Sequence, residues 1–232
     1  KGPLKDLGML FVCALCGVGI NQGLFIVGLT RSSPVDASII ATAVPIFVLL
    51  LAAVILKEPI TRKKSFGVFM GVSGGLLLVF SSTHAIDSIS SLDGDMMMIV
   101  SGLMYAIYLV LSKPLSLRYS SVTMMKWMFL FTTLTLVPFT FRHVLDAPAF
   151  HREVWDFTEL GAIFYVLFGA TFLPYLLIPM SLKRIRPTTV SMYNYVQPIV
   201  ASFIAVMIGQ DTLSWQKVLS AVLVLTGVYH VT

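Results

Sequence analysis

Residues 186–217 read RPTTVSMYNYVQPIVASFIAVMIGQDTLSWQK, and residues 33–64 read SPVDASIIATAVPIFVLLLAAVILKEPITRKK. At an offset of 153 positions the two stretches align without a gap, and a proline, a serine and a second proline keep their register. The matched positions extend to both sides, and they are Leu29/Leu182, Arg31/Arg184, Pro34/Pro187, Ser38/Ser191, Pro45/Pro198, Ile46/Ile199, Ala52/Ala205, Ile55/Ile208, Lys64/Lys217 and Gly74/Gly227, with Glu58 opposite Asp211. Similarity at one fixed offset predicts an internal repeat.

The composition places this repeat in a membrane. Hydrophobic residues make up 57% of the 232 positions and charged residues 12%, about half the charged fraction of a soluble domain. The apolar runs have roughly the length that crosses a hydrocarbon core, and they lack the alternation of barrel strands. We therefore predict an all-α integral membrane protein with eight transmembrane helices, at residues 7–29, 35–56, 65–80, 96–111, 122–138, 160–182, 188–209 and 218–231.

The two copies of the repeat are predicted to be inverted. Between Pro34 and Pro187 the chain is expected to cross the bilayer five times, and an odd number of crossings turns the second copy upside down. Inverted repeats are typical of secondary transporters that work by alternating access. Because 96–111 and 122–138 have no partner at this offset, we expect two more helices, in roughly 60 residues, before residue 1.

The basic residues predict the orientation. Twelve of the 16 Lys and Arg residues belong to one set of alternating loops, including Lys126 just inside a helix, and four belong to the other set. Basic loops are retained in the cytoplasm, so we expect the first set and both ends of the chain on that side. The net charge of +5 follows from loops that face anionic headgroups, so no nucleic-acid partner is expected.

Four stretches carry a resemblance to a known family: GLTRSSP at 28–34, ATAVPIFVLLLAAVILKEPITRKK at 41–64, SGLMYAIYLVLSKPL at 101–115, and residues 186–217. In them the chain resembles the EamA type of the drug/metabolite transporter superfamily, in particular its bacterial members. The resemblance implies a ten-helix permease of two five-helix repeats in a bacterial cytoplasmic (inner) membrane. Residues 1–80 would hold the last three helices of the first repeat, and residues 96–232 would hold the second repeat.

The resemblance also implies that the fourth helix of each repeat has a central proline and ends in an acidic residue, commonly in a Gly-Glu pair. This chain reads Lys57-Glu58 and Gln210-Asp211 at those positions. The acidic residue is therefore kept, and the glycine is not.

Polar side chains within the helices mark a candidate substrate path, since such groups tend to face the bundle interior or a water-filled cavity. Ser191, Asn194, Tyr195 and Pro198 follow the i, i+3, i+4, i+7 spacing of one helical face. The predicted path consists of Asn21, Gln22, Ser38, Thr42, Ser101, Tyr105, Tyr108, Tyr175, Ser191, Asn194, Tyr195 and Gln197. For the three serines, a purely structural bond to a helix backbone is an equal alternative.

Two prolines and three glycines suggest mechanical roles. Pro45 and Pro198 interrupt helices at matched positions, so we interpret them as hinges, with a static bend as the alternative. Gly67, Gly71 and Gly75 form a small-residue stripe for close helix packing, either against 218–231 or in a homodimer.

The leading functional hypothesis is a secondary transporter that exports a small amphipathic metabolite, such as an amino acid, so the expected partners are the lipid bilayer and a small-molecule substrate. One alternative is an antiporter of phosphorylated compounds or nucleotide sugars, which would want Lys or Arg inside the helices. The other is a membrane protein with a structural or receptor role. We find no G-x-S-x-G or H-E-x-x-H motif and no membrane-embedded carboxylate pair, so no enzyme activity, cofactor or metal is expected.

Overall fold

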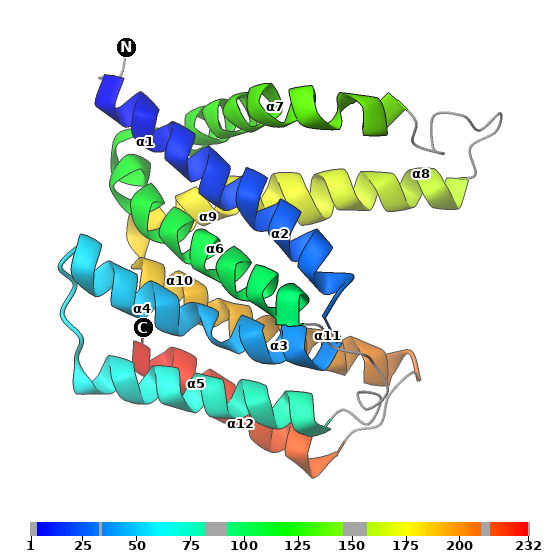
Figure 1. The fold of residues 1–232 in the computed structure, drawn as a ribbon. Helices are drawn as coiled ribbons and strands as arrows, with labels where there is room; N and C mark the ends of the chain where they lie inside the picture. Colours follow the sequence, from blue (N-terminus) through cyan, green and yellow to red (C-terminus); the bar gives the residue numbers. More distant parts are fainter. Residues whose placement is uncertain (1–3, 33, 82–91, 146–156, 210–213, 232) are drawn as a thin grey trace.

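The computed structural model describes residues 4–32, 34–81, 92–145, 157–209 and 214–231, and these residues form helices and connections without a strand (Figure 1). The predicted all-α class is confirmed for this part of the chain. In chain order the elements are α1 (Leu4–Ala14), η1 (Leu15–Gly19), α2 (Ile20–Leu29), α3 (Pro34–Thr42), α4 (Val44–Ile55), α5 (Arg62–Ser81), α6 (Leu92–Arg118), α7 (Ser121–Leu145), α8 (Phe157–Phe164), η3 (Tyr165–Phe172), α9 (Leu173–Arg184), α10 (Pro187–Met192), η4 (Tyr193–Tyr195), α11 (Val196–Met207) and α12 (Trp215–Val231).

Six helical segments are long and apolar enough to cross a membrane, and they are Leu4–Leu29, Asp36–Ile55, Arg62–Phe80, Leu92–Arg118, Ser121–Phe141 and Phe157–Arg184. The segments formed by α10 to α11 and by α12 are not among these six. The prediction of eight spans is therefore met for six of them within the described residues, and the last two stay a prediction.

The segments lie side by side, and successive ones run in opposite directions (Figure 1). One end of the bundle carries the α4–α5 connection, the end of α6 and the α9–α10 connection. We call it the basic end, because its cations are Lys57, Arg62, Lys63, Lys64, Lys113, Arg118, Lys183, Arg184 and Arg186. Most of the predicted path residues lie farther from this end, on α2, α3, α6, α9 and the η4–α11 segment.

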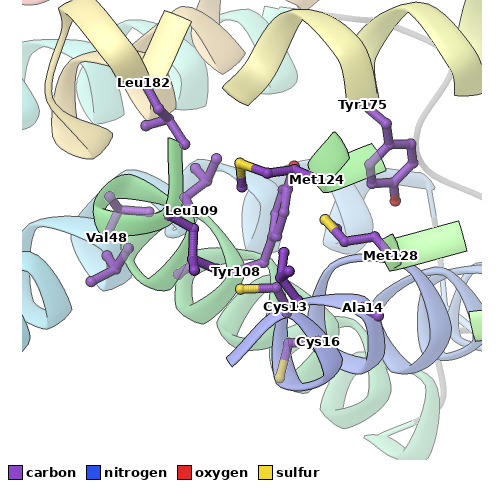
Figure 2. Close-up of a cluster of buried hydrophobic side chains, with 14 of the residues drawn as sticks. Cys13, Ala14, Cys16, Val48, Tyr108, Leu109, Met124, Met128, Tyr175 and Leu182 are labelled. Carbon is purple, nitrogen blue, oxygen red and sulfur yellow. The ribbon is translucent and has the colours of Figure 1, made fainter. Parts of the chain in front are cut away.

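Apolar side chains fill the half of the bundle next to the basic end (Figure 2). Leu10 and Cys13 of α1 pack there with side chains from α4, α6, α7 and α9, among them Val48, Leu109 and Leu182. Cys13 and Cys16 are free thiols in or beside this cluster, in agreement with a packing role. A second cluster joins α5 to α12 and to the α10–α11 segment, with Tyr195 and Val224 in its interior.

Two helical irregularities recur at the offset of the repeat. The π-helical turn η1 spans Leu15–Gly19, and a shift of 153 positions places it at 168–172, inside the π-helical η3. Likewise, the helix breaks at Ala43, between α3 and α4, and a shift of 153 reaches Val196, which directly follows the 3-10 turn η4. Such local departures from α-helix frequently occur at functional sites.

The helix α6 is longer than predicted at both ends, extending from Leu92 to Arg118 instead of 96–111. The predicted span ended at Leu111, two residues before Lys113, because a charged residue is costly in lipid. In the structure the Lys113 ammonium donates hydrogen bonds to the main-chain oxygens of Leu182 and Ile185, and Arg118 pairs with Asp6 at 2.9 Å. Partners at the basic end therefore let the helix continue through its polar residues.

Lys57 ends α4 in the left-handed region, with φ 55°. The amide of Glu58 then donates to the carbonyl of Ala52, which closes the helix end. A left-handed residue directly after the C-cap is a common way for a helix to end. This is the position at which the family resemblance implies glycine. Lys57 adopts the left-handed conformation here although its Cβ disfavours it. This turn directs the chain from α4 into the α4–α5 connection.

Replacing Lys57 by glycine is expected to stabilise the protein. A left-handed residue other than glycine costs about 1–2 kcal/mol, and glycine relieves this strain. Glycine also loses more backbone entropy on folding, which offsets part of the gain, so the free energy of unfolding should rise by roughly 0.5–1 kcal/mol. The measurement is the thermal unfolding midpoint in detergent. Lys63→Gly, an exposed site inside α5, is the control and should lower the midpoint; a fall for Lys57→Gly as well would contradict the prediction.

Candidate functional site: a cavity between the helices

A cavity of about 840 Å³ lies between the helices, on the far side of the apolar cluster from the basic end. Its wall is formed by α2, α3, the beginning of α4, α5, α6, the η3–α9 segment and the η4–α11 segment. Phe25, Val79 and Ser202 lie near the ends of α2, α5 and α11 that point away from the basic end. The cavity thus extends toward the end of the bundle opposite to the basic end.

Ten of the twelve predicted path residues line this cavity, and they are Asn21, Gln22, Ser38, Thr42, Ser101, Tyr105, Tyr175, Asn194, Tyr195 and Gln197. Pro198 and Gly75 also line it, whereas Pro45 lies just below, at the start of α4. Five different helical segments supply these polar groups, which the sequence could place on faces but not next to one another. That a substrate travels along them stays a prediction.

Tyr108 and Ser191 do not line the cavity. The Tyr108 ring lies against Gly17 in η1, where a Cβ would be 2.6 Å from the ring, so this tyrosine is drawn into the apolar cluster (Figure 2). Ser191 is fully buried, and its hydroxyl donates to the Thr188 carbonyl at 2.8 Å, within its own helix. The backbone-bonding alternative for Ser191 is therefore what the structure contains.

Asn21 and Ser101 connect α2 to α6 on the cavity wall. The Asn21 amide nitrogen donates to the Ser101 carbonyl at 2.9 Å and to its hydroxyl at 3.1 Å, and the Ser101 hydroxyl donates to the Asn21 carbonyl at 2.9 Å. These bonds occupy the donors of both side chains. The pair consequently fixes the two helices, and it leaves less hydrogen-bonding capacity for a solute than the sequence suggested.

Two further hydrogen bonds on the wall join residues 153 positions apart. The Gln22 amide donates to the Tyr175 hydroxyl at 3.4 Å, and the Tyr195 hydroxyl donates to the Thr42 carbonyl at 2.6 Å. The Tyr175 hydroxyl in turn donates to the carbonyl of Gly17 in η1. The cavity is therefore crossed by contacts between positions that correspond to each other in the predicted repeat.

The prolines weaken the helix backbone beside the cavity. Pro45 cannot donate to the Ala41 carbonyl, and Pro198 cannot donate to the Asn194 carbonyl, because proline has no backbone N–H. Both Ala41 and Asn194 line the cavity. A hinge role for the two prolines stays a prediction, and the neighbouring breaks at Ala43 and η4 show where such a hinge would bend.

The wall is mostly apolar, and the polar and aromatic groups on it carry no charge. None of the described residues on it is an Asp, Glu, Lys, Arg or His. Gln197 and Ser202 make no side-chain hydrogen bond to another described residue, so their polar groups are available to a solute. Phe25, Met98 and Ser202 were not predicted, although each follows or precedes a predicted residue by three or four positions, and helical spacing alone could have found them.

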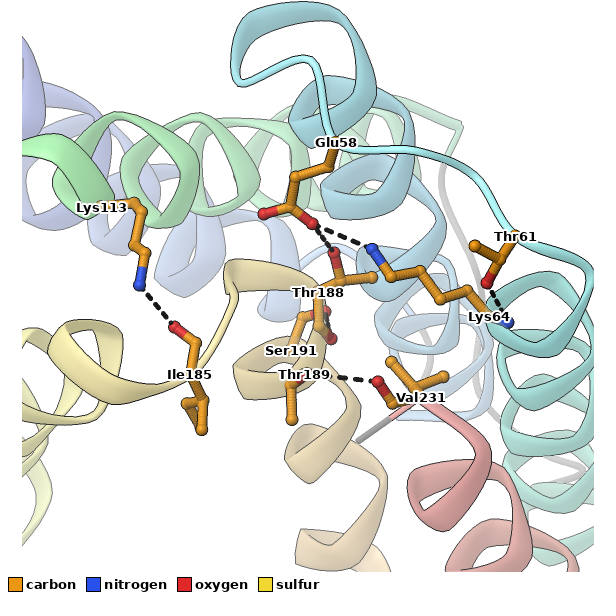
Figure 3. Close-up of polar contacts among 9 residues, drawn as sticks. All are labelled: Glu58, Thr61, Lys64, Lys113, Ile185, Thr188, Thr189, Ser191 and Val231. Atoms are coloured by element: carbon orange, nitrogen blue, oxygen red, sulfur yellow. Dashed lines mark hydrogen bonds and ion pairs between the residues drawn. The ribbon is translucent and has the colours of Figure 1, made fainter.

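The basic end of the bundle is closed by polar contacts (Figure 3). Glu58 pairs with Lys64 at 3.1 Å and accepts a hydrogen bond from Thr188 at 3.3 Å, while Lys113 binds the carbonyl of Ile185 at 3.0 Å. Asp6 accepts bonds from Arg118 and from the Tyr119 hydroxyl. These contacts and the apolar cluster separate the cavity from the basic end.

Comparison with known proteins agrees with the sequence resemblance. The chain is 26% identical to an uncharacterized transporter of Archaeoglobus fulgidus, over 96% of this chain and 75% of that protein. It is 28% identical to the uncharacterized transporter YyaM of Bacillus subtilis, over 97% and 72% of the two chains. A protein of Salmonella typhimurium named a probable amino-acid metabolite efflux pump is 24% identical, over 83% of this chain and 65% of that protein.

A solved crystal structure has the same fold, with a TM-score of 0.80 at 17% sequence identity, over 100% of this chain and 77% of the other. The model of the EamA-like transporter family matches residues 1–80 and 92–232. The family predicted from the four stretches of sequence is thereby confirmed. This protein belongs to the EamA-like transporter family.

Proposed function

We propose that the protein is a secondary transporter that exports a small amphipathic metabolite, such as an amino acid, across a bacterial cytoplasmic membrane by alternating access. The observation that carries this proposal is the cavity of about 840 Å³ with amide, hydroxyl and aromatic groups and no charged side chain on its described wall. Such a site suits a solute that has an apolar part and few polar groups and carries no net charge.

The contacts across the cavity support alternating access. Two copies of a repeat that are related by a two-fold axis bring equivalent residues together only near that axis. Gln22 with Tyr175, and Thr42 with Tyr195, are such equivalent pairs. The proposed repeats, in residues 1–80 and 96–232, would then meet at the cavity, where a change in their packing can expose the solute to either side.

The charges support an orientation with the basic end in the cytoplasm. In that orientation the cavity extends toward the outside and is closed toward the cytoplasm, which corresponds to an outward-facing conformation. Export from this site would require the basic end to open. The name of the Salmonella relative, a probable amino-acid metabolite efflux pump, fits this direction and this class of solute.

Counterflow in proteoliposomes tests the proposal. The full-length protein is reconstituted in vesicles preloaded with one of a panel of zwitterionic amino acids, uncharged metabolites and sugar phosphates, and uptake of the same labelled compound is followed. We expect counterflow for at least one amphipathic amino acid and none for the sugar phosphates, because the cavity wall offers no cation to a phosphate group. Counterflow of sugar phosphates alone would establish the antiporter alternative instead.

A further inference from the structure

A buried carboxylate at the basic end joins three segments of the chain. One oxygen of Glu58, Oε2, accepts hydrogen bonds from the Lys64 ammonium at 3.1 Å and from the Thr188 hydroxyl at 3.3 Å (Figure 3). The side chains of Lys64 and Glu58 are 9% and 13% exposed, and Thr188 is fully buried. Removing one partner of a buried, hydrogen-bonded charge leaves the other uncompensated, so these contacts are strongly coupled.

The local structure holds Glu58 in place. The left-handed turn at Lys57 ends α4 and brings the Glu58 side chain back over the helix end. Thr61 accepts a hydrogen bond from the Lys64 amide at 3.3 Å at the beginning of α5, and this positions the lysine. The ion pair between Glu58 and Lys64 is thus built within a single connection, independently of α10.

The bond to Thr188 is different, because it crosses to another part of the bundle. Thr188 lies in the first turn of α10, 130 positions along the chain from Glu58. Toward the cavity, α10 leads into η4 with Asn194 and Tyr195, while α4 is preceded by Ala41 and Thr42. The bond from Thr188 to Glu58 therefore ties together, at the basic end, two segments that both reach the cavity wall, where the Tyr195 hydroxyl bonds to the Thr42 carbonyl.

The sequence of the repeat makes this tie specific to the basic end. At the offset of 153, Glu58 corresponds to Asp211 and Lys64 to Lys217, but Thr188 corresponds to Val35. Valine has no hydroxyl group and cannot donate the equivalent hydrogen bond. Asp211 lies outside the described residues, while Lys217 is 7% exposed. The acid and the lysine are thus repeated in the sequence at the other end, and the hydroxyl donor is not.

We propose that the hydrogen bond from Thr188 to Glu58, supported by the Glu58–Lys64 ion pair, is a latch that keeps the cavity closed at the basic end, and that it breaks whenever a solute passes that end. This proposal deepens the transport function above and rests on it. In this role Glu58 and Thr188 are positioning residues, because they act through the separation of α4 from α10.

The native thiol of Cys13 provides a readout that needs no substrate. Cys13 is fully buried in the apolar cluster between the cavity and the basic end. Opening of α4 away from α10 would bring water into this cluster. The rate at which a membrane-impermeant maleimide labels Cys13 therefore reports how often the basic end opens. It can be measured separately from each side of the membrane by fragment-ion mass spectrometry, which distinguishes Cys13 from the second free thiol, Cys16, on the same peptide.

The test compares Thr188→Val with Thr189→Val in sealed vesicles of both orientations, using the full-length protein. Thr188→Val removes the latch hydroxyl at nearly constant shape, whereas Thr189 is a buried neighbour whose hydroxyl donates to the Val231 carbonyl instead. Labelling of Cys13 is expected to be about tenfold faster in Thr188→Val, the population shift that corresponds to losing one hydrogen bond to a charged group. The increase should occur only from the side of the basic end, identified by a maleimide-reactive Lys63→Cys marker.

The remaining outcomes decide the proposal in either direction. Thr188→Ser keeps the hydroxyl and should label at the original rate. Equal labelling of Thr188→Val and Thr189→Val, or faster labelling from both sides, would overturn the latch. If Thr188→Val does not fold, Glu58→Gln, which keeps an acceptor oxygen but weakens it by removing the charge, should give a smaller one-sided increase. Labelling requires no solute, so a failure of counterflow would not alter the labelling result. Conversely, normal counterflow would not support the latch if the labelling rates contradict it.

Discussion

Gly67→Leu is expected to destabilise the protein strongly and to lower its folded yield. The helices α5 and α12 touch through their backbones at this residue, where a Cβ would lie 2.6 Å from the Gly227 carbonyl oxygen and 2.7 Å from a methyl group of Val231. A backbone atom cannot rotate away as a side chain can, so the two helices would have to separate. Overpacking costs roughly 1–3 kcal/mol or more, a large part of a total stability of about 5–15 kcal/mol.

Separation would also remove neighbouring contacts. The Ser220 hydroxyl donates to the Gly74 carbonyl across the same interface, and Val224 and Val228 pack there. Gly71 and Gly75 face the Tyr195 ring, so the stripe continues from the α12 contact to the cavity wall. The stripe predicted for helix packing thus makes contacts inside the chain, and a homodimer through it stays a prediction that these contacts do not require.

The measurement for Gly67→Leu is the yield of monodisperse protein in detergent. A pair of smaller substitutions supplies the control: Gly8→Ala, where a Cβ would meet nothing within 4 Å, and Gly67→Ala. Alanine normally stabilises a helix by about 0.5–1 kcal/mol relative to glycine, so Gly8→Ala should raise the unfolding midpoint. Gly67→Ala should lower it, and a rise at both positions would show that the close contact is absent.

Ala41→Trp is expected to abolish transport while leaving the fold intact. Ala41 belongs to α3, lines the cavity and is exposed toward it, in the turn before the helix breaks at Ala43. An indole ring at this position would occupy space that the solute needs. It would also meet the aromatic and amide groups of the wall, which can accommodate it without burying an unpaired charge.

The measurement for Ala41→Trp is counterflow of a solute that the unaltered protein exchanges, at equal amounts of reconstituted protein. Val222→Trp is the control, because Val222 is 55% exposed on the outside of α12, away from the cavity wall. It should transport at the original rate. Equal activity of the two variants, with unchanged unfolding midpoints, would show that the solute does not pass through this cavity.

Much of the wall could be predicted from sequence because a helix repeats its faces at a known spacing. Asn194 and Tyr195 share a face with Pro198, and the structure places all three at the cavity. Tyr108 does not line the cavity, for a reason that helical spacing cannot supply. Tyr105 lies on the cavity wall, but the side chain of Tyr108 points to Gly17, whose missing Cβ leaves a space into which the ring fits.

The polar residues near the basic end show a second limit of prediction from sequence. In the sequence, Lys113 and Glu58 mark the ends of apolar runs, because no local pattern indicates their hydrogen-bond partners. Those partners are the carbonyl of Ile185 and the hydroxyl of Thr188, which come from a connection more than 70 positions away in the chain. Long-range partners of this kind depend on how the helices pack, so the length of α6 and the closure at Glu58 could not be predicted.

The sequence by itself determined the membrane class, the family and six helical segments that are long and apolar enough to span a membrane, because apolar length and helical spacing are local properties of the chain. It also determined the offset of 153, which later coincided with two hydrogen bonds across the cavity. Only the tertiary structure decided which polar groups share one cavity, which of them are used up in helix contacts, and which end of the bundle is closed. These features depend on distances between segments far apart in sequence, and packing alone sets those distances.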